Sequence, residues 1–558
     1  MATTTTPSTL TPAERRVRRA RAMVYLEGRI AKLRDPSIAH AAGEHALPRA
    51  MMELGALYAE SARTQVPGDA DKTTPAPSIG LYRQVLREHP SFPGRAMALY
   101  LLGHAFNDAG RMDEAQQVWR SFVCHNHFAY PVPPDPKDPD RDTLVPKPQD
   151  NTREYWVTFR RRFEDPAKLA KPTVETTYVD IYPDTCVPAP MLPADSAAQY
   201  LAEAWWQIGN WESDERDLGA GVLPEESLSV WGLSRANSAF RHATQFPRST
   251  GYLFVLYKFA WTLLNQQRYR GAVEAYVRFL EASENGSGTG TSGAAPHALD
   301  EAAFAGIAEA LVNADFEGPR ADAPFVARPH ALDTLAPDKA ESALRVAIQR
   351  VKDPNVLPQD RAWTPRVYMR LAQRLRELGL LQLASETFAL VASKFALEPV
   401  AAQAELGRAD VDLQLTFAAR PASHEFDLAL ERAVQSAISL LDYVGDTQWT
   451  RANMANTESL ERARLAAIER LRGMIATLFL VASRAGSPAS TPESKPVLEM
   501  RLSHASRAYR SAGRCIRLLL PQAPLAGEKA ELHSREQAAR AEYIRIQGLL
   551  RRPLEWEP

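Results

Sequence analysis

The sequence predicts an all-α fold in which pairs of helices repeat and stack into a right-handed solenoid. Small residues recur at a fixed step, since Gly103 is followed twelve positions later by Ala115 and four positions further on by Trp119. The same spacing occurs twice more, at Ala260, Ala272 and Tyr276 and at Ala372, Ala384 and Phe388. One long segment, 130–195, breaks this rhythm.

This spacing is the signature of the tetratricopeptide repeat, a helix–turn–helix unit of about 34 residues. Small residues such as Gly103 and Ala115 allow the two helices of a unit to approach closely. Large neighbours such as Leu99 and Phe122 then fill the space against the next unit. One helix pair cannot bury its apolar face alone, so the units stack and form an extended concave surface.

Residues 1–47 are expected to form an N-terminal tail and a basic capping helix. The helix should span 12–34, where arginines surround apolar residues such as Val17 and Ile30. We interpret it as a terminal cap with a solvated basic face, because the ends of repeat arrays need polar outer surfaces. The alternative is a contact with an anionic surface or a partner.

Residues 48–129 are expected to hold the first two repeat units, the first of which ends at Pro90. Residues 130–195 form a non-repeat insertion. Its opening, 131–140, is too rich in proline to be helical. Its later part, 174–182, is β-branched and aromatic, which favours a short hairpin or an extended arm.

Units three to six are expected within 196–400, where flexible loops such as 283–296 separate helices. Beyond residue 400 the helical pattern continues but the small-residue signature fades. We therefore expect 401–558 to contain degenerate helical repeats that end in capping helices.

Composition excludes several classes of function. The 66 basic and 67 acidic residues give a net charge of −1, so no global field attracts nucleic acid. No apolar run is long enough to span a membrane. The three cysteines, Cys124, Cys186 and Cys515, lie far apart, and we expect no disulfide framework. The first residues lack a secretory signal, which predicts a cytoplasmic protein; a start further upstream would instead indicate the periplasm or the outer membrane.

No segment has the pattern of a catalytic, metal or cofactor site. Residues 124–127 (Cys-His-Asn-His) contain three zinc-ligand types, but no second ligand pair lies nearby, and a helix end is the better interpretation. The glycine-rich stretch 286–293 lacks the lysine of a phosphate-binding loop. The sequence therefore predicts a protein that is not an enzyme and needs no metal or cofactor.

A protein or peptide partner is expected to bind the groove formed by the first helices of successive units. Helical phase places certain residues between the core positions, facing this groove. These residues are Tyr100, His104 and Asn107 in the second unit, Lys258 and Thr262 in the fourth, and Arg370 and Arg374 in the sixth.

Parts of the chain resemble a bacterial tetratricopeptide group that includes adventurous-gliding-motility proteins. The similar segments are 78–90 with 98–105, 246–264, and the phrase Tyr-Lys-Phe-Ala-Trp at 257–261. The resemblance covers roughly residues 48–310. It implies an exported scaffold that assembles with other envelope components and has no catalytic residues.

Two functions remain open on the sequence. One is a non-enzymatic scaffold for protein–protein interaction, in a bacterial envelope or gliding-motility assembly. The alternative is a cytoplasmic regulatory or adaptor module whose groove is occluded by its own insertion.

Overall fold

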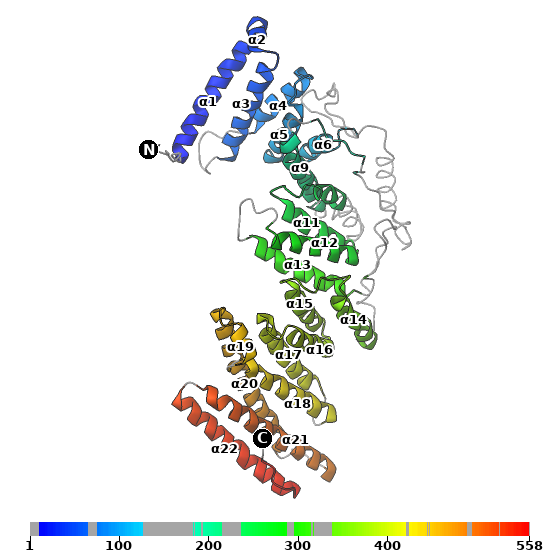
Figure 1. Ribbon diagram of the computed structural model, residues 1–558, viewed down its shortest axis with the longest axis vertical. Coiled ribbons are helices and arrows are strands. Elements are labelled where there is room, and N and C mark those ends of the chain that lie inside the picture. Colours follow the sequence, from blue (N-terminus) through cyan, green and yellow to red (C-terminus); the bar gives the residue numbers. More distant parts are fainter. Residues whose placement is uncertain are drawn as a thin grey trace. The chain divides into compact units, whose positions relative to one another are not determined.

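The computed structural model describes residues 11–64, 75–126, 182, 185–190, 194–214, 236–286, 295–313, 316, 337–419, 423–443, 445, 447–487, 494–523 and 525–556. Within these ranges all regular structure is helical and no strand occurs, so the all-α solenoid prediction is confirmed (Figure 1). The strand-like segment 174–181 lies outside the described residues, as does most of the 130–195 insertion. The chain divides into two compact units, one of 1–300 with 317–329 and one of 301–316 with 330–558.

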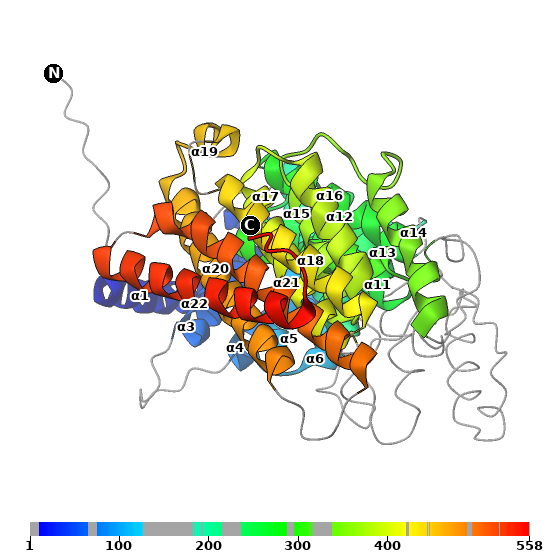
Figure 2. The ribbon, with the colours of Figure 1, turned by 90° about the horizontal axis from the view of Figure 1, so that it is seen from below.

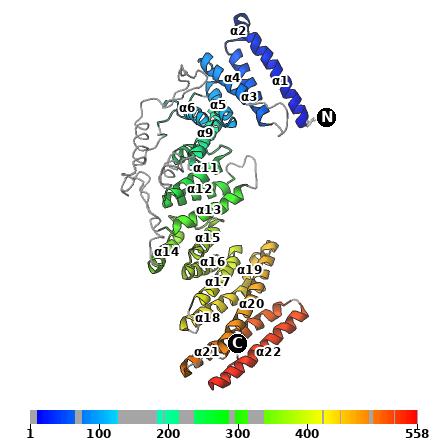
Figure 3. The same cartoon turned by 180° about the vertical axis from the view of Figure 1, so that it is seen from behind.

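The first unit begins with a long helix and continues as helix pairs, in which α3 packs on α4, α5 on α6 and α11 on α12 (Figure 3). Its helices are α1 (Pro12–Leu33), α2 (Pro36–Ala42), α3 (Ala46–Arg63), α4 (Ala76–Glu88), α5 (Arg95–Asp108), α6 (Met112–Val123), α9 (Ala194–Asp214), helical residues 236–243, α11 (Tyr252–Asn265), α12 (Tyr269–Glu284) and the start of α13 (Ala295–Leu311).

The second unit takes up the rest of α13 and continues through further pairs into three long helices. Its helices are α14 (Pro337–Lys352), α15 (Thr364–Glu377), α16 (Leu381–Lys394), α17 (Pro399–Ala418), α18 (His424–Ser439), η3 (Leu440–Tyr443), α19 (Gln448–Ala452), α20 (Thr457–Gly486), α21 (Lys495–Leu519), η4 (Leu520–Gln522) and α22 (Ala526–Leu550). Figure 2 shows the last three, α20, α21 and α22, packed as neighbours.

The turn between the two helices of a pair has the same geometry three times. Its left-handed residue is Gly110 after α5, Gln267 after α11 and Gly379 after α15, with φ of 73°, 59° and 76°. In each turn this residue donates its N–H to the carbonyl three residues back, and the next residue donates to the carbonyl five residues back. These bonds satisfy carbonyls that the helix end leaves without a partner.

Glycines on one helix of a pair lie directly against an aromatic ring on the other. The ring of Trp119 in α6 leaves so little space beside Gly103 in α5 that a Cβ atom would lie 2.2 Å from the indole nitrogen. Gly55 meets Tyr82, Gly209 meets Phe240 and Gly407 meets Phe388 in the same manner, at 2.7, 2.5 and 2.6 Å. All four rings are fully buried. The small-and-aromatic pattern is therefore the contact that joins neighbouring helices.

The second unit ends by folding its last residues back over α21 and α22. Trp556 covers Gly513 in α21, where a Cβ would lie 2.8 Å from the indole ring. The ring of Trp556 also lies 5.1 Å from that of Tyr543 in α22, and the Tyr543 hydroxyl donates to the Glu555 carbonyl at 2.9 Å. The same type of contact thus covers the C-terminal helices.

Replacing Gly103 by valine should destabilise the first unit by about 3 kcal/mol or more, because the new atoms overlap a buried ring that cannot move. Gly80, exposed in α4, is the matched control, since a Cβ there meets nothing within 4 Å. Gly80→Ala should stabilise by about 0.5–1 kcal/mol through helix propensity. Denaturant unfolding measures both changes. Equal stability of Gly103→Val and the wild type would contradict the close approach.

Candidate protein-binding face and its disulfide-anchored segment

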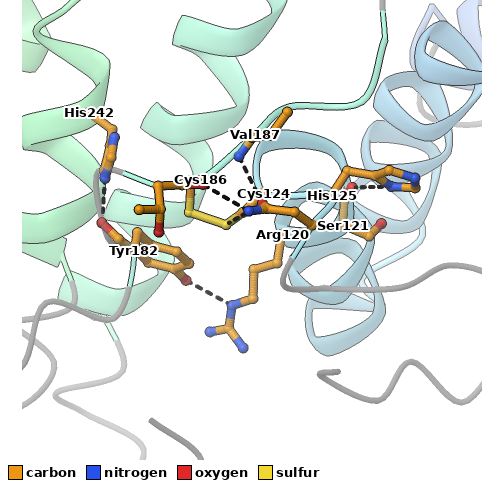
Figure 4. Close-up of a disulfide and its surroundings, with 10 residues drawn as sticks. Arg120, Ser121, Cys124, His125, Tyr182, Cys186, Val187 and His242 are labelled. Carbon is orange, nitrogen blue, oxygen red and sulfur yellow. Dashed lines mark hydrogen bonds between the residues drawn. A yellow bond between two sulfur atoms is a disulfide. The ribbon is translucent and has the colours of Figure 1, made fainter. Parts of the chain in front are cut away.

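A disulfide joins the end of α6 to the far end of the insertion. Cys124 follows the last residue of α6 and is bonded to Cys186, 62 positions later (Figure 4). The expectation that the cysteines form no disulfide framework is wrong for this pair. Spacing along the chain carries no information here, because the fold brings both cysteines together. Cys515 is the free cysteine; it is buried in α21, and burial raises the pKa of its thiol to about 12.

Residues 185–190, here called the anchor segment, run along the end of α6. The N–H of His125 donates to the Val187 carbonyl at 2.7 Å, and the N–H of Ala189 donates to the Phe122 carbonyl at 2.8 Å. Asn126 makes two further bonds, since its Nδ2 donates to the Thr185 carbonyl and its Oδ1 accepts from the Val187 N–H, both at 2.8 Å. Backbone pairing therefore holds this segment together with the disulfide.

Just before the anchor segment, Tyr182 is fully buried among three helices. Its hydroxyl accepts a hydrogen bond from Arg120 Nε at 2.9 Å, and its carbonyl accepts one from His242 Nε2 (Figure 4). Its ring meets Trp205 of α9 edge-on at 5.0 Å, and Trp205 stacks on His242 at 4.5 Å. The insertion thus returns to the solenoid through a residue that contacts α6, α9 and the 236–243 helix.

Arg120 is half-buried beside the anchor segment, and its charge is balanced by a carboxylate. It forms an ion pair with Glu212 of α9, whose side chain is fully buried. Burial alone would lower the pKa of Arg120, but Tyr182 and Glu212 together outweigh it and raise the pKa. The fully buried Glu212 carboxylate needs this partner, because leaving a buried charge unpaired is strongly unfavourable.

The disulfide also bears on the zinc interpretation of 124–127. The sulfur of Cys124 is bonded to Cys186 and is not available as a thiolate ligand. His127 lies outside the described residues. Among the residues that the structure does describe, no group of three or more His, Cys, Asp or Glu side chains could hold a metal ion.

Within each of the two compact units, polar contacts connect the first helices of successive helix pairs, and we call the surface that carries these contacts the first-helix face of that unit. In the first unit Arg63 of α3 pairs with Asp108 of α5 at 3.0 Å, and His104 of α5 lies 3.4 Å from Glu203 of α9. The hydroxyl of Tyr100 also donates to Glu203. One carboxylate on α9 therefore holds two side chains of α5.

The same arrangement recurs in the second unit. Arg374 of α15 pairs with Glu309 of α13 at 2.6 Å. Asp410 of α17 lies between Arg376 of α15, at 3.9 Å, and Arg470 of α20. All these charges are partly exposed. Such partly exposed pairs contribute little to stability.

The predicted groove residues that belong to the first compact unit, residues of the second and fourth repeats, differ in how far they are buried. Tyr100 and Thr262 are buried; Thr262 accepts a hydrogen bond from Asn237 Nδ2 at 2.9 Å inside the packed helices. For these two, the expectation of a side chain facing an open groove does not hold. His104, Asn107 and Lys258 are half-buried, and the Lys258 ammonium lies 5.1 Å from the Trp261 ring centre.

In the second compact unit, Arg374 lies on the first-helix face through its pair with Glu309 of α13, and Arg370 lies one turn earlier on the same helix, α15. Arg370 and Arg374 are about 30% and 28% exposed, and Glu377 lies within 2.8 Å and 3.4 Å of them. Their charges are thus shared with Glu377 and, for Arg374, with Glu309. That the seven residues bind a partner stays a prediction.

Sequence reasoning missed a buried acidic cluster in α17. Asp412 accepts hydrogen bonds from Ser385 of α16, at 2.6 Å, and from Ser436 of α18. Glu405, on the same helix, pairs with Arg408 at 3.3 Å. Burial raises the pKa of Glu405. These groups join three helices and have internal partners. No local motif marks them, because their partners come from different helices.

No protein-family model and no curated protein matches this chain. Among solved structures, it is similar to the crystal structure of the yeast Tom70, with 12% identity over 95% of this chain and 97% of that chain. The TM-score of 0.15 is too low for this likeness to carry an argument. Within the described residues, no helix has the length and apolar character to cross a membrane. The described helices are those of an all-α solenoid built from packed helix pairs.

The contacts of His104 predict a pH dependence. Burial lowers its pKa from 6.5, although Glu203 and Asp108 act in the opposite direction. Below about pH 6.5 the unfolded chain binds a proton at this histidine that the folded chain resists, so folding stability falls as the pH falls. His104→Gln removes this contribution. Urea unfolding between pH 7.5 and 5.5 should show a smaller acid-induced loss for His104→Gln than for the wild type.

The matched control for this measurement is His40→Gln, because His40 is exposed on α2. That variant should follow the wild type at every pH. If His104→Gln lost as much stability on acidification as the wild type, a lowered pKa of His104 in the folded protein would be excluded.

Proposed function

We propose that this chain is a non-enzymatic scaffold that binds a protein or peptide partner along the first-helix face. The observation that carries the proposal is that partly exposed ion pairs join successive first helices in each compact unit. In a tetratricopeptide-like solenoid these helices form the extended surface that partners occupy. The mechanism is affinity and geometry, with no chemistry.

The charges on this face indicate what a partner would offer. Arg374 and Asp410 already have internal partners of opposite sign. A bound segment would therefore replace one member of a pair, for example by placing a carboxylate near Arg370 and Arg374. The net charge of −1 makes nucleic acid a poor candidate. No cofactor takes part.

The compartment belongs to the proposal as well. A disulfide with further backbone bonding around it is typical of proteins in an oxidising environment. This supports an exported protein and fits the envelope or gliding-motility setting implied by the sequence resemblance. A cytoplasmic adaptor would keep both thiols reduced.

One observation favours a second candidate, a module whose insertion occludes its own binding face. Both ends of the insertion are attached to the same place, since Cys124 ends α6 and Cys186 lies in the anchor segment beside it. The stretch of chain between Cys124 and Cys186 therefore leaves and rejoins the described structure at one point, the end of α6. Release of this segment would then expose the face.

Partner capture tests the scaffold. Tagged full-length protein is expected to retain a defined partner from cell fractions, and Arg370→Glu with Arg374→Glu should reduce its recovery roughly tenfold. The control is Arg432→Glu, a charge reversal at an exposed position of α18, a second helix. Equal recovery by both variants would contradict binding at the first-helix face.

A chain lacking 130–180, which keeps Tyr182 and the disulfide, should bind more strongly only if the insertion occludes the face.

The cysteine pair tests the compartment. Mass spectrometry of protein isolated from its native cells without reductant should find Cys124 joined to Cys186. Cys124→Ser with Cys186→Ser should lower the free energy of unfolding by about 2–4 kcal/mol, because the cross-link closes a long loop. Adding reductant to the wild type should have the same effect, and reductant should not affect the double variant. Two free thiols in the native protein would contradict an oxidising compartment.

A further inference from the structure

The first helix, α1, is held in a fixed orientation by its inner face. Leu26, Ile30 and Leu33 are buried against the helices that follow. In its first half Arg19 forms an ion pair with Glu60 of α3 at 2.6 Å, and in its second half Glu27 accepts a hydrogen bond from Tyr58 of α3. Because contacts along its length fix its rotation, α1 presents a defined outer face.

That outer face carries apolar side chains that no described element covers. Val17, Val24 and Tyr25 are 52%, 68% and 66% exposed. The space beside the neighbouring Gly28 is open, since a Cβ there would meet nothing within 4 Å. Figure 1 shows α3 along one side of α1 and no described helix along the other. Apolar groups at a spacing of seven residues on one helix face are typical of contact with another helix.

A row of cations borders this apolar face. The row runs parallel to Val17 and Val24, and Tyr25 lies in its middle. Its cations, which follow one another at helical spacing, are Arg18, Arg21, Arg29 and Lys32. All four are exposed, and none has an ion-pair partner among the described residues. This differs from the first-helix face, where the charges are internally paired.

Charge decides which partner fits. Residues 12–34 contain eight basic and two acidic side chains, so a second copy of α1 would bring like charges together. A lipid surface would attract the cations, but binding to lipid also scales with buried apolar area, and this face offers two valines and one tyrosine rather than Trp, Phe or Leu. An acidic helix satisfies both features, since its carboxylates meet the row and its apolar stripe meets Val17 and Val24.

We propose that the outer face of α1 is a docking site for an acidic amphipathic helix of a partner protein. This site is separate from the first-helix face, and neither proposal depends on the other. Binding would pack one more helix beside α1, in the way that neighbouring helices pack within a solenoid. The cations supply orientation and rate of association, and the apolar residues supply the buried contact.

The test uses a synthetic amphipathic helical peptide with Leu and Ala on one face and Glu along the flanks. Fluorescence anisotropy with the full-length protein should give saturable binding that weakens as salt is raised. A peptide with Lys in place of Glu should not bind. Arg21→Glu with Arg29→Glu should weaken binding roughly tenfold or more, and Val24→Asp should do the same.

Arg278→Glu is the matched control, because Arg278 is exposed on α12, away from α1. It should bind as the wild type does, and thermal melts should show that every variant is folded. No binding by the wild type, or equal binding by the Arg21→Glu/Arg29→Glu protein, would overturn the proposal. Two other results would also overturn it. One is binding to vesicles of phosphatidylserine and phosphatidylcholine that is lost in Val24→Asp, when no peptide binds. The other is a dimer in sedimentation velocity that is lost in Val24→Asp.

Discussion

The close approach of a glycine to an aromatic ring is the contact on which this molecule depends. Where Trp119 covers Gly103, the indole occupies the place that any larger side chain would need. The pair α5–α6 can therefore pack only at short distance, and its remaining large residues must be buried by the next pair. The same contact at Gly55, Gly209 and Gly407 extends this constraint through both units. A solenoid follows because each pair is incomplete without a neighbour.

The insertion interrupts the succession of helix pairs, because it separates α6 from α9 along the chain. The fold restores the stack by returning the chain at Tyr182, where the ring packs on Trp205 and the hydroxyl meets Arg120. The disulfide then fixes the anchor segment on the end of α6. A long insertion is tolerated here because both of its ends are bonded near one point, which limits the entropy that the loop can cost.

The polar surfaces of the chain fall into two kinds, and the difference has physical consequences. On the first-helix face, charges such as Arg374 and Glu309 are paired within the molecule, so a partner must compete for them. On the outer face of α1, cations such as Arg21 and Arg29 have no ion-pair partner within the part of the chain that the structure describes. In the binding that we propose, a partner at the first surface exchanges existing ion pairs, whereas a partner at the second forms new ones. The two surfaces should therefore differ in selectivity and in dependence on salt.

The sequence by itself determined the helical class, the repeat and its small-and-aromatic pattern, because these depend on residues close together in the chain. The step from Gly103 to Ala115 and Trp119 describes contacts within one helix pair, and local spacing is sufficient to find it. The tertiary structure alone decided that Cys124 bonds to Cys186, that Tyr100 and Thr262 are buried, and that Arg374 meets Glu309. Each of these depends on how one helix pair is placed against another or on where the insertion returns. Such long-range placement comes from the packing of whole helices, and no short motif records it.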